Sequence, residues 1–199
     1  MKKIGLIGML LIATLHVSAQ TSAPNQKVES FTLQGEAGQN IALADFAANK
    51  AVVVVFTNDH CPYSRLYTNR LQELYSVYSG KGVKFLFIKP AISTDNAPIE
   101  NPNSANKVSS VISNNFPYVT DANQKVSQQL GATKTPEVFV IEPQNGNFLL
   151  RYKGAIDDNP QVESYAKETY LKTAIEAILT NQAPAITQKR ATGCTIKRF

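Results

Sequence analysis

The sequence predicts an α/β protein in which a central mixed β-sheet is flanked by helices. Two runs of β-branched and aromatic residues, at 51–56 and 83–88, have the composition of strands that are buried on both faces. A segment with helical periodicity, 62–79, separates them, and this strand–helix–strand order is typical of a parallel strand pair. A predicted hairpin at 137–152 adds antiparallel strands, so we expect a mixed sheet.

The first half of the chain supplies short strands, one helical turn and one long helix. Glycines lie between the first two strands and after the long helix, where turns and helix ends favour them. The expected elements are strands at 31–33, 41–43, 51–56 and 83–88, a helical turn from Leu43 to Phe46, and a helix at 62–79 that ends at Gly80 and Gly82.

The second half begins with a proline-rich surface loop and ends with an amphipathic helix. Asp121 has the residue type of an N-cap, and Gly131 that of a helix stop. The expected elements are a loop at 90–103, a helix at 104–114, a strand at 116–119, a helix at 122–130, strands at 137–142 and 148–152 around a turn at 143–147, a polar loop at 154–160 and a helix at 162–179. The tail from 181 to 199 has no strong period, and we expect it to be flexible.

The composition is that of one globular domain. Of the 199 residues, 43% are hydrophobic and 18% are charged, which is enough apolar material for a substantial core. The formal net charge is +5, but the basic residues are scattered, and the sequence contains no nucleic-acid motif, phosphate-binding glycine loop or zinc-ligand cluster. We therefore expect no nucleic-acid partner, no metal and no organic cofactor.

The N-terminus has the pattern of a secretory signal peptide. Lys2 and Lys3 precede an apolar stretch at 4–15, and Val17-Ser18-Ala19 form a small-residue cleavage site. The apolar stretch is shorter than the about 20 residues that a helix needs to span a bilayer, although an uncleaved anchor stays an alternative.

Cleavage after Ala19 divides the chain into three parts. We expect a leader at 1–19, a domain at 20–180 and a C-terminal tail at 181–199. The mature protein is then expected in the periplasm or the extracellular medium, without a membrane-spanning segment.

Cys61 is the candidate catalytic residue. It follows a predicted buried strand and directly precedes Pro62, a residue that suits the first position of a helix. Cys61 would then lie at a helix N-terminus, where free N–H groups and the helix dipole favour the thiolate, the nucleophilic form of cysteine. An inert buried cysteine is the alternative reading.

The chain has one other cysteine, Cys194, which lies in the tail. A compartment outside the cytoplasm permits disulfides, and two cysteines allow one bridge without requiring it. Cys194 is either a resolving thiol, which attacks an oxidised Cys61, or an incidental tail residue.

Several segments, in their order along the chain, resemble extracytoplasmic redoxins of the AhpC/TSA and thioredoxin-like superfamily. Cys61-Pro62-Tyr63-Ser64 resembles a Cys-x-x-Cys active site with serine in the second cysteine position. Thr135-Pro136 occupies the place of the cis-proline of that family. The segments 151–158 and 193–197 also match motifs of similar members. The resemblance implies a thioredoxin-like fold and a thiol-dependent oxidoreductase.

The resemblance also assigns roles to the site residues. Cys61 would be the nucleophile, Ser64 would hydrogen-bond to its sulfur, and Thr135 and Pro136 would form the wall against which a substrate docks. The substrate would be a thiol or disulfide of a protein or a small molecule, and an external redox partner would reset the cysteine. The tail is long enough for Cys194 to reach Cys61, and we expect mild oxidation to join them.

Two departures from the family pattern limit the prediction of activity. Ser64 cannot form a disulfide within the motif, and Asn58 replaces the threonine of the peroxiredoxin Thr-x-x-Cys pattern. The missing threonine argues against efficient peroxide reduction. A peroxidase, either with one cysteine or with Cys194 resolving Cys61, is still an alternative, and oxidation of Cys61 by peroxide at the slow rate of a free cysteine would argue against it. A binding protein without enzymatic activity is a second alternative, in which Cys61→Ser would change nothing.

Two further groups of residues have open roles. His60 could place a positive charge beside the Cys61 thiolate, or it could be an ordinary surface residue. Asp157 and Asp158 could form an acid–base pair, but adjacent acids in a polar loop are usually solvated turn residues, and we expect the same here.

Overall fold

The computed structural model describes residues 25–35, 37–92 and 118–198. The predicted leader at 1–19, the predicted helix at 104–114 and most of the predicted loop at 90–103 lie outside the described residues. Within the described part, no helix is long and apolar enough to cross a membrane.

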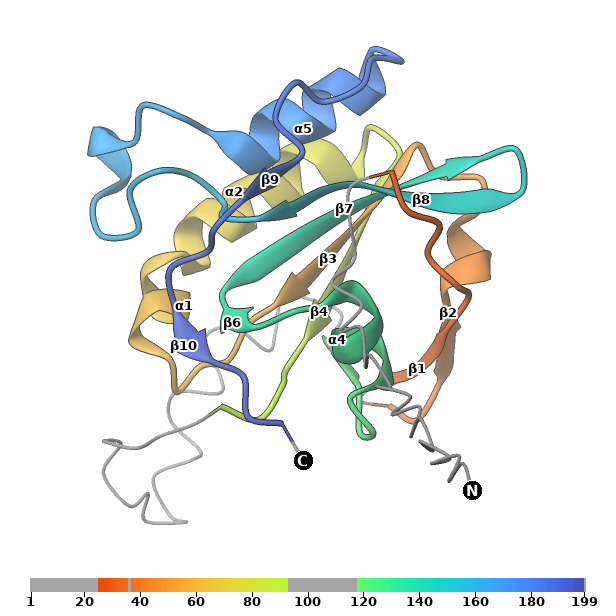
Figure 1. Cartoon of the computed structure of the whole chain (residues 1–199), viewed down its shortest axis with the longest axis horizontal. Helices are drawn as coiled ribbons and strands as arrows, with labels where there is room; N and C mark the ends of the chain where they lie inside the picture. Colours follow the sequence, from red (N-terminus) through yellow and green to blue (C-terminus); the bar gives the residue numbers. More distant parts are fainter. Residues whose placement is uncertain (1–24, 36, 93–117, 199) are drawn as a thin grey trace, which may run out of the picture.

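An eight-stranded mixed sheet forms the centre of the molecule, as the sequence predicts (Figure 1). Its strands lie in the order β2-β1-β5-β4-β3-β7-β8-β9. Strand β3 pairs in parallel with β4 on one side and antiparallel with β7 on the other, and all of its residues are buried. The strands are β1 (Thr32–Gly35), β2 (Asn40–Ala42), β3 (Ala51–Phe56), β4 (Val83–Ile88), β5 (Tyr118–Thr120), β7 (Glu137–Gln144), β8 (Asn147–Gly154) and β9 (Gln188–Lys189).

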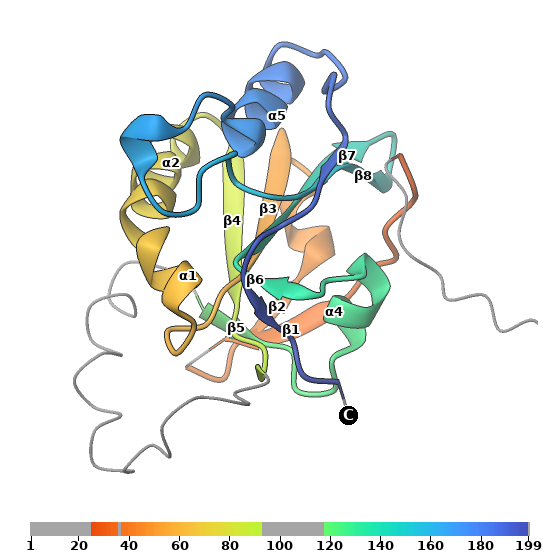
Figure 2. The same ribbon diagram turned by 60° about the vertical axis from the view of Figure 1, so that its left-hand side comes forward.

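Helices cover both faces of the sheet (Figures 1 and 2). On one face, α2 (Thr68–Ser79) and α5 (Tyr170–Leu179) pack against Val53 and Val55. On the other face, the helical turn η1 (Leu43–Phe46) and α4 (Lys125–Leu130) pack against Val52 and Val54. The alternation of side chains along β3 therefore divides the core into two halves, as expected for a strand that is buried on both faces.

The helix predicted at 62–79 is divided in two. Helix α1 (Pro62–Leu66) ends at Tyr67, and α2 begins at Thr68. Tyr67 has φ −89° and ψ −2°, and its hydroxyl donates a hydrogen bond of 2.6 Å to Asp157. The break thus occurs at a buried tyrosine whose side chain is fixed from another part of the chain.

The other two described helices begin later than predicted. Gln124 adopts a left-handed conformation with φ 54°, so α4 starts at Lys125. Asp121 nevertheless stabilises the N-terminus of α4, because its carboxylate accepts hydrogen bonds from the backbone N–H groups of Val126 and Ser127. The segment before α5 contains a separate helical turn, η2 (Glu163–Tyr165), and α5 starts only at Tyr170.

The predicted hairpin is confirmed, but its strands are longer and its turn is shorter. Strands β7 and β8 are joined at Asn145 and Gly146, which have φ values of 50° and 75°. Two consecutive residues with positive φ form the type of tight turn that suits the twist of an antiparallel pair.

The end of the tail pairs with the domain, whereas the sequence predicts a tail without regular structure. We call residues 187–198 the strap. Strand β9 of the strap extends the sheet in parallel with β8, and β10 (Cys194–Thr195) pairs antiparallel with β6 (Lys134–Thr135). The backbones approach closely at Gly193, where a Cβ atom would lie 2.1 Å from the carbonyl oxygen of Thr135. Only glycine permits this distance.

The end of the strap is also fastened to the domain. The side chain of Gln124 donates a hydrogen bond of 2.6 Å to the carbonyl oxygen of Lys197. The guanidinium group of Arg198 donates to the carbonyl oxygens of Ser127 and Ala132 near the end of α4. A cation is favoured at this end of a helix, where carbonyl groups lack partners.

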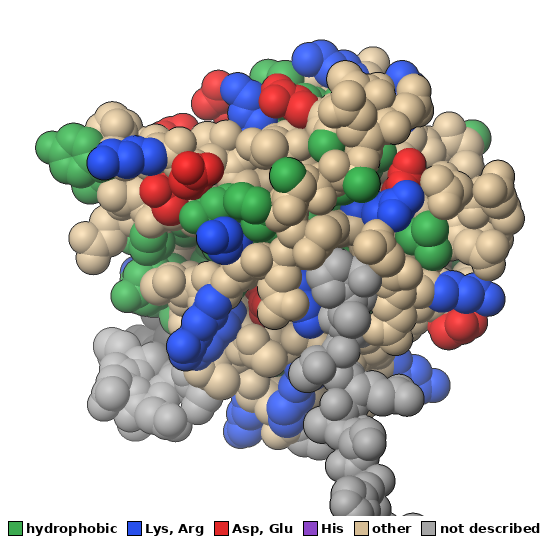
Figure 3. All heavy atoms as spheres, turned by 45° about the horizontal axis from the view of Figure 1, so that its top comes forward, with side chains coloured by type: hydrophobic (Ala, Val, Ile, Leu, Met, Phe, Trp, Pro, Cys, Tyr) green, Lys and Arg blue, Asp and Glu red, His purple; other side chains and the backbone are tan. Residues whose placement is uncertain are grey.

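The face of the molecule shown in Figure 3 carries acidic and basic side chains that are interspersed, and its hydrophobic side chains lie in separate small groups. This distribution agrees with the scattered charges in the sequence.

Candidate active site

Cys61 caps the N-terminus of α1, and Pro62 occupies the first helical position, as predicted. The turn between β3 and α1 is held by Asn58. The backbone N–H of Cys61 donates to the Asn58 carbonyl oxygen at 2.9 Å. The Asn58 side chain donates to the carbonyl oxygen of Pro90 at 2.8 Å and accepts from the backbone N–H of His60 at 2.9 Å. Cys61 is therefore fixed by the end of the strand, by its own turn and by the helix that follows.

The sulfur atoms of Cys61 and Cys194 are bonded to each other, and the two Cα atoms lie 5.8 Å apart. This distance is ordinary for a disulfide. Cys61 is fully buried, whereas Cys194 is partly exposed. The backbone N–H of Cys194 donates to the Cys61 sulfur at 3.3 Å. The structure thus contains the bridge that we expect from the sequence, and the strap delivers a hydrogen-bond donor to the candidate nucleophile.

Thr135 and Pro136 lie directly beside this bridge, and the peptide bond between them is cis, as the resemblance implies. Thr135 pairs with Cys194 in the antiparallel register of β6 and β10, and its carbonyl oxygen lies 3.1 Å from the Cys61 sulfur. The wall predicted for substrate docking is therefore covered by the protein's own residues 193–195 in this disulfide-bonded state.

In this disulfide-bonded state Ser64 makes no described hydrogen bond to the Cys61 sulfur, and the bond expected for the reduced cysteine stays a prediction. The Ser64 side chain is buried, and its hydroxyl accepts a hydrogen bond from the backbone N–H of Asn58 at 3.3 Å. Ser64 thus supports the turn that carries Cys61. His60 is exposed, and its backbone N–H contributes to the same turn.

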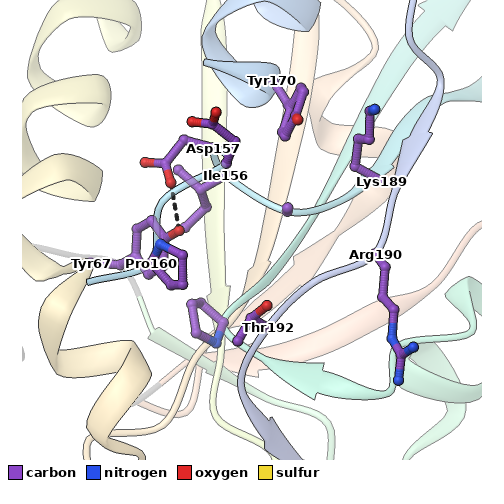
Figure 4. Close-up of a pocket in the computed structure, with 11 residues that line it drawn as sticks. Tyr67, Ile156, Asp157, Pro160, Tyr170, Lys189, Arg190 and Thr192 are labelled. Carbon is purple, nitrogen blue, oxygen red and sulfur yellow. Dashed lines mark hydrogen bonds between the residues drawn. The ribbon is translucent and has the colours of Figure 1, made fainter. Parts of the chain in front are cut away.

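A cavity of about 310 Å³ lies next to Pro136 (Figure 4). Its walls come from α1–α2 through Tyr67, from the loop after β8 through Ile156 and Asp157, and from the strap through Thr192. The disulfide, the cis-proline and this cavity therefore form one continuous region, with the strap along its edge.

Asp157 is buried in the wall of this cavity, which corrects the prediction that both loop acids are solvated. Its carboxylate accepts hydrogen bonds of 2.6 Å from the Tyr67 hydroxyl and 2.6 Å from the Arg70 guanidinium group. The guanidinium group also lies over the Tyr67 ring, 4.4 Å from its centroid. Burial raises the pKa of Tyr67 above its ordinary value, and the hydrogen bond to Asp157 raises it further. Tyr67 therefore remains a hydrogen-bond donor at neutral pH.

The roles of Tyr67 and Arg70 were not predicted from the sequence. A signal was present, because the two residues are three positions apart on the helix face that also carries Leu71 and Leu74. An arginine on an apolar helix face needs a buried carboxylate, and Asp157 supplies it.

Asp158 is exposed, as expected, but its carboxylate has partners. It accepts hydrogen bonds from the backbone N–H groups of Glu168 and Lys167, and these lower the pKa of the carboxyl group. Neither aspartate contacts the disulfide in any described interaction. Among the described residues, no group of three or more His, Cys, Asp or Glu side chains could hold a metal ion.

Comparison with known proteins gives one family and many similar structures. The AhpC/TSA family model matches residues 24–156, a region that includes Cys61 and ends before Cys194. A search of curated proteins found no match to the chain.

Two solved structures resemble most of the chain. A hypothetical protein from Sinorhizobium meliloti is 26% identical with a TM-score of 0.74, over 90% of this chain and 97% of that chain. An uncharacterized conserved protein from Geobacillus kaustophilus is 26% identical with a TM-score of 0.73, over 89% of this chain and 93% of that chain.

A third structure identifies the fold. The thioredoxin domain of a thiol-disulfide oxidoreductase from Bacteroides vulgatus is 17% identical with a TM-score of 0.50, over 67% of this chain and 91% of that chain. The chain therefore has the thioredoxin-like fold that its sequence resembles.

The buried pair of Arg70 and Asp157 yields a first test. Both side chains are about 95% buried, so Asp157→Asn removes the buried counter-charge of the guanidinium group and leaves it only the exposed Glu163 carboxylate, 3.7 Å from its Nε. We expect the free energy of unfolding at pH 7, measured by urea denaturation, to fall by about 3 kcal/mol.

Asp158→Asn is the matched control, and we expect a much smaller loss. Because the fold lowers the Asp158 pKa, the stabilisation from this carboxylate is present above the unfolded pKa of about 3.9 and is lost as the pH falls through the lower folded value. Equal losses at pH 7 in the two variants would contradict the distinction between a buried and an exposed aspartate.

The close approach at Gly193 yields a second test. Gly193→Ala places a Cβ atom against the Thr135 backbone, so β10 must move away from β6. We expect the oxidised protein to lose about 1–3 kcal/mol of unfolding free energy, as for other overpacked sites. Gly80→Ala is the control, because no atom lies within 4 Å of the added carbon. If both variants unfold at the same urea concentration, the strap does not depend on this contact.

Proposed function

Because the chain belongs to the AhpC/TSA family, we propose that Cys61 and Cys194 form a redox couple that exchanges two electrons with thiols and disulfides of other molecules. The protein is a thiol-dependent oxidoreductase of this family. The observation that carries the proposal is the bond between the capping cysteine of α1 and a cysteine of the strap, 133 residues apart in the sequence.

The proposed reaction has two exchange steps. The Cys61 thiolate of the reduced protein attacks one sulfur of a substrate disulfide, which forms a mixed disulfide and releases the first substrate thiolate. The Cys194 thiolate then attacks the Cys61 sulfur, which forms the Cys61–Cys194 bond and releases the second substrate thiolate. The substrate gains two electrons and two protons, and an external dithiol returns them to the protein.

The surroundings of Cys61 support its role as the nucleophile. It lies at a helix N-terminus and accepts the backbone N–H of Cys194, and both features favour a thiolate over a thiol. We propose that Cys194 is the resolving residue. The strap is held before residues 193–195 by β9 and after them by contacts of Lys197 and Arg198, so Cys194 stays tethered near Cys61 when residues 193–195 leave β6. Such tethering gives a high effective concentration of the attacking thiol.

The pairing of β10 with β6 supports a substrate with an extended backbone. Once residues 193–195 have moved aside, the backbone edge at Thr135 is available for a peptide strand, which is a common mode of peptide recognition. The cavity beside Pro136 would receive a neighbouring side chain of that peptide. A small-molecule disulfide remains an alternative substrate.

The N-terminal segment supports a location outside the cytoplasm. Its basic and apolar pattern with a small-residue cleavage site is that of a secretory leader. A structural or catalytic disulfide is compatible with the periplasm and the extracellular medium, where disulfides persist.

Replacement of each cysteine by serine tests the proposed order of the two steps. The wild-type protein should reduce a disulfide-linked peptide in the presence of an external dithiol. Cys194→Ser should accumulate a mixed disulfide between Cys61 and the peptide, because the resolving thiol is missing. Cys61→Ser should lose at least about 100-fold in rate, as expected when a nucleophile is removed. Mass spectrometry of quenched samples identifies the trapped species.

The same variants distinguish the two alternatives. If peroxide oxidises Cys61 far faster than the dithiol reaction proceeds, and water is released as the Cys61–Cys194 bond forms, the protein is a peroxidase instead. If Cys61→Ser retains full activity, or if no variant traps a mixed disulfide, the exchange mechanism is wrong and a binding role becomes the better account.

A further inference from the structure

A second cavity, of about 370 Å³, lies on the other side of the strap. Its walls are the loop that leads into β6, the strand ends at Glu137 and Lys153, and the strap from Gln188 to Ala191. Its basic side chains are Lys134, Lys153, Lys189 and Arg190, and Glu137 is its acidic side chain. We call this space the basic cavity.

Lys153 is the residue that most needs explanation. Its exposed fraction is 8%, and within the described part of the chain its ammonium group has no hydrogen-bond or ion-pair partner. The preceding residue, Tyr152, packs into the core under α2 and α5, so Lys153 projects from the opposite face of β8. The stem of the Lys153 side chain is thus mostly buried, and the residue lines the basic cavity, so a ligand in the cavity could supply the counter-charge.

The one acidic residue of the basic cavity is already engaged. The Glu137 carboxylate accepts the backbone N–H groups of Thr133 at 2.6 Å and Lys134 at 2.9 Å, through a single oxygen atom. It thereby holds the loop that leads to the cis-proline. The basic cavity therefore has one negative charge, from Glu137, and three positive charges, from Lys134, Lys153 and Arg190.

The other cations leave this excess uncompensated. The Lys134 ammonium group donates to the neutral hydroxyl of Thr195 at 2.9 Å. Arg190 extends from the strap on the side away from Tyr67 and Asp157, so those groups do not neutralise it (Figure 4). Lys189 is directed elsewhere, because its ammonium group lies over the ring of Tyr170, 5.2 Å from the centroid.

We propose that the basic cavity binds a small anion with two or more negative charges, held by Lys153 from the sheet and by Arg190 from the strap. The volume lies in the range of small-molecule sites, about 300–1,000 Å³, so an organic anion fits as well as an inorganic one. A charge of at least two suits two cations carried by neighbouring segments, here the end of β8 and the strap, and arginine is well shaped for carboxylate and phosphate oxygens. The bound anion joins the strap to the sheet on the side opposite the cavity beside Pro136.

Calorimetric titration of the oxidised protein at low ionic strength tests the site. Citrate and inorganic phosphate are the two probes, and acetate is the monovalent control. We expect citrate or phosphate to bind, acetate not to bind, and Arg190→Gln to weaken binding by about tenfold, the effect of losing one charge-assisted contact. The preference between the two probes distinguishes a carboxylate ligand from a phosphate ligand.

Lys153→Met should abolish binding, because it replaces the ammonium group at the cavity with an apolar chain of similar length. Lys172→Gln, an exposed lysine on α5, is the matched control and should bind as the wild type does. Thermal unfolding gives a readout that does not depend on calorimetry. The anion should raise the midpoint of the wild type and of Lys172→Gln, but not that of Lys153→Met.

The same thermal data decide between the anion site and a purely internal role. Without added anion, we expect Lys153→Met to unfold at a higher temperature than the wild type, because one of several like charges around the basic cavity has been removed. The proposal is overturned if neither probe binds at about 10 mM, a concentration at which even a weak specific site is occupied. It is also overturned if citrate affects Lys153→Met and the wild type equally. A lower midpoint for Lys153→Met would assign Lys153 to Glu137 as its counter-charge.

Discussion

The bond between Cys61 and Cys194 is the constraint on which the functional region depends. It joins the turn after the central strand β3 to a residue 133 positions later. The strap therefore runs from β9 at the edge of the sheet to β10 beside β6, where Cys194 meets Cys61. Backbone pairing on both sides of Cys194 and the contacts of Arg198 at α4 keep the strap in place. The strap in turn forms one wall of each cavity described here, so the redox state of one bond bears on both sides of the molecule.

The sequence predicted best what depends on local chemistry. The strands at 51–56 and 83–88 agree with the structure to the residue, because a run of β-branched and aromatic residues specifies a buried strand by itself. The place of Cys61 at a helix N-terminus was also predicted from local chemistry, because Pro62 suits the first helical position. The strap was not predicted, since its strands have two residues each and no hydrophobic period. Their existence depends on distant partners and on a close approach at Gly193, neither of which a local pattern reveals.

The site shows the same division. Local sequence led to Cys61, the cysteine count to Cys194, and the resemblance to Thr135 and Pro136. The structure brings these four residues together. The hydrogen bond expected from Ser64 to the reduced sulfur stays a prediction; in the disulfide state the Ser64 hydroxyl accepts the backbone N–H of Asn58 in the turn. Asp157 was read as a solvated loop residue, since nothing in its neighbourhood of the sequence indicates that Arg70, 87 residues earlier, will lie against it. Burial of a charged residue is a property of the assembled fold.

The central claim is that Cys61 and Cys194 form one reversible two-electron couple within a single chain. The most direct measurement is a redox titration of the purified protein in glutathione buffers of increasing reducing power, with free thiols alkylated and counted by mass spectrometry. The account predicts that monomers gain two alkylated cysteines together, with the slope of a two-electron reaction, and that the oxidised form contains the linked Cys61 and Cys194 peptides. Separate titration of the two cysteines, or bridges found only between chains, would contradict it.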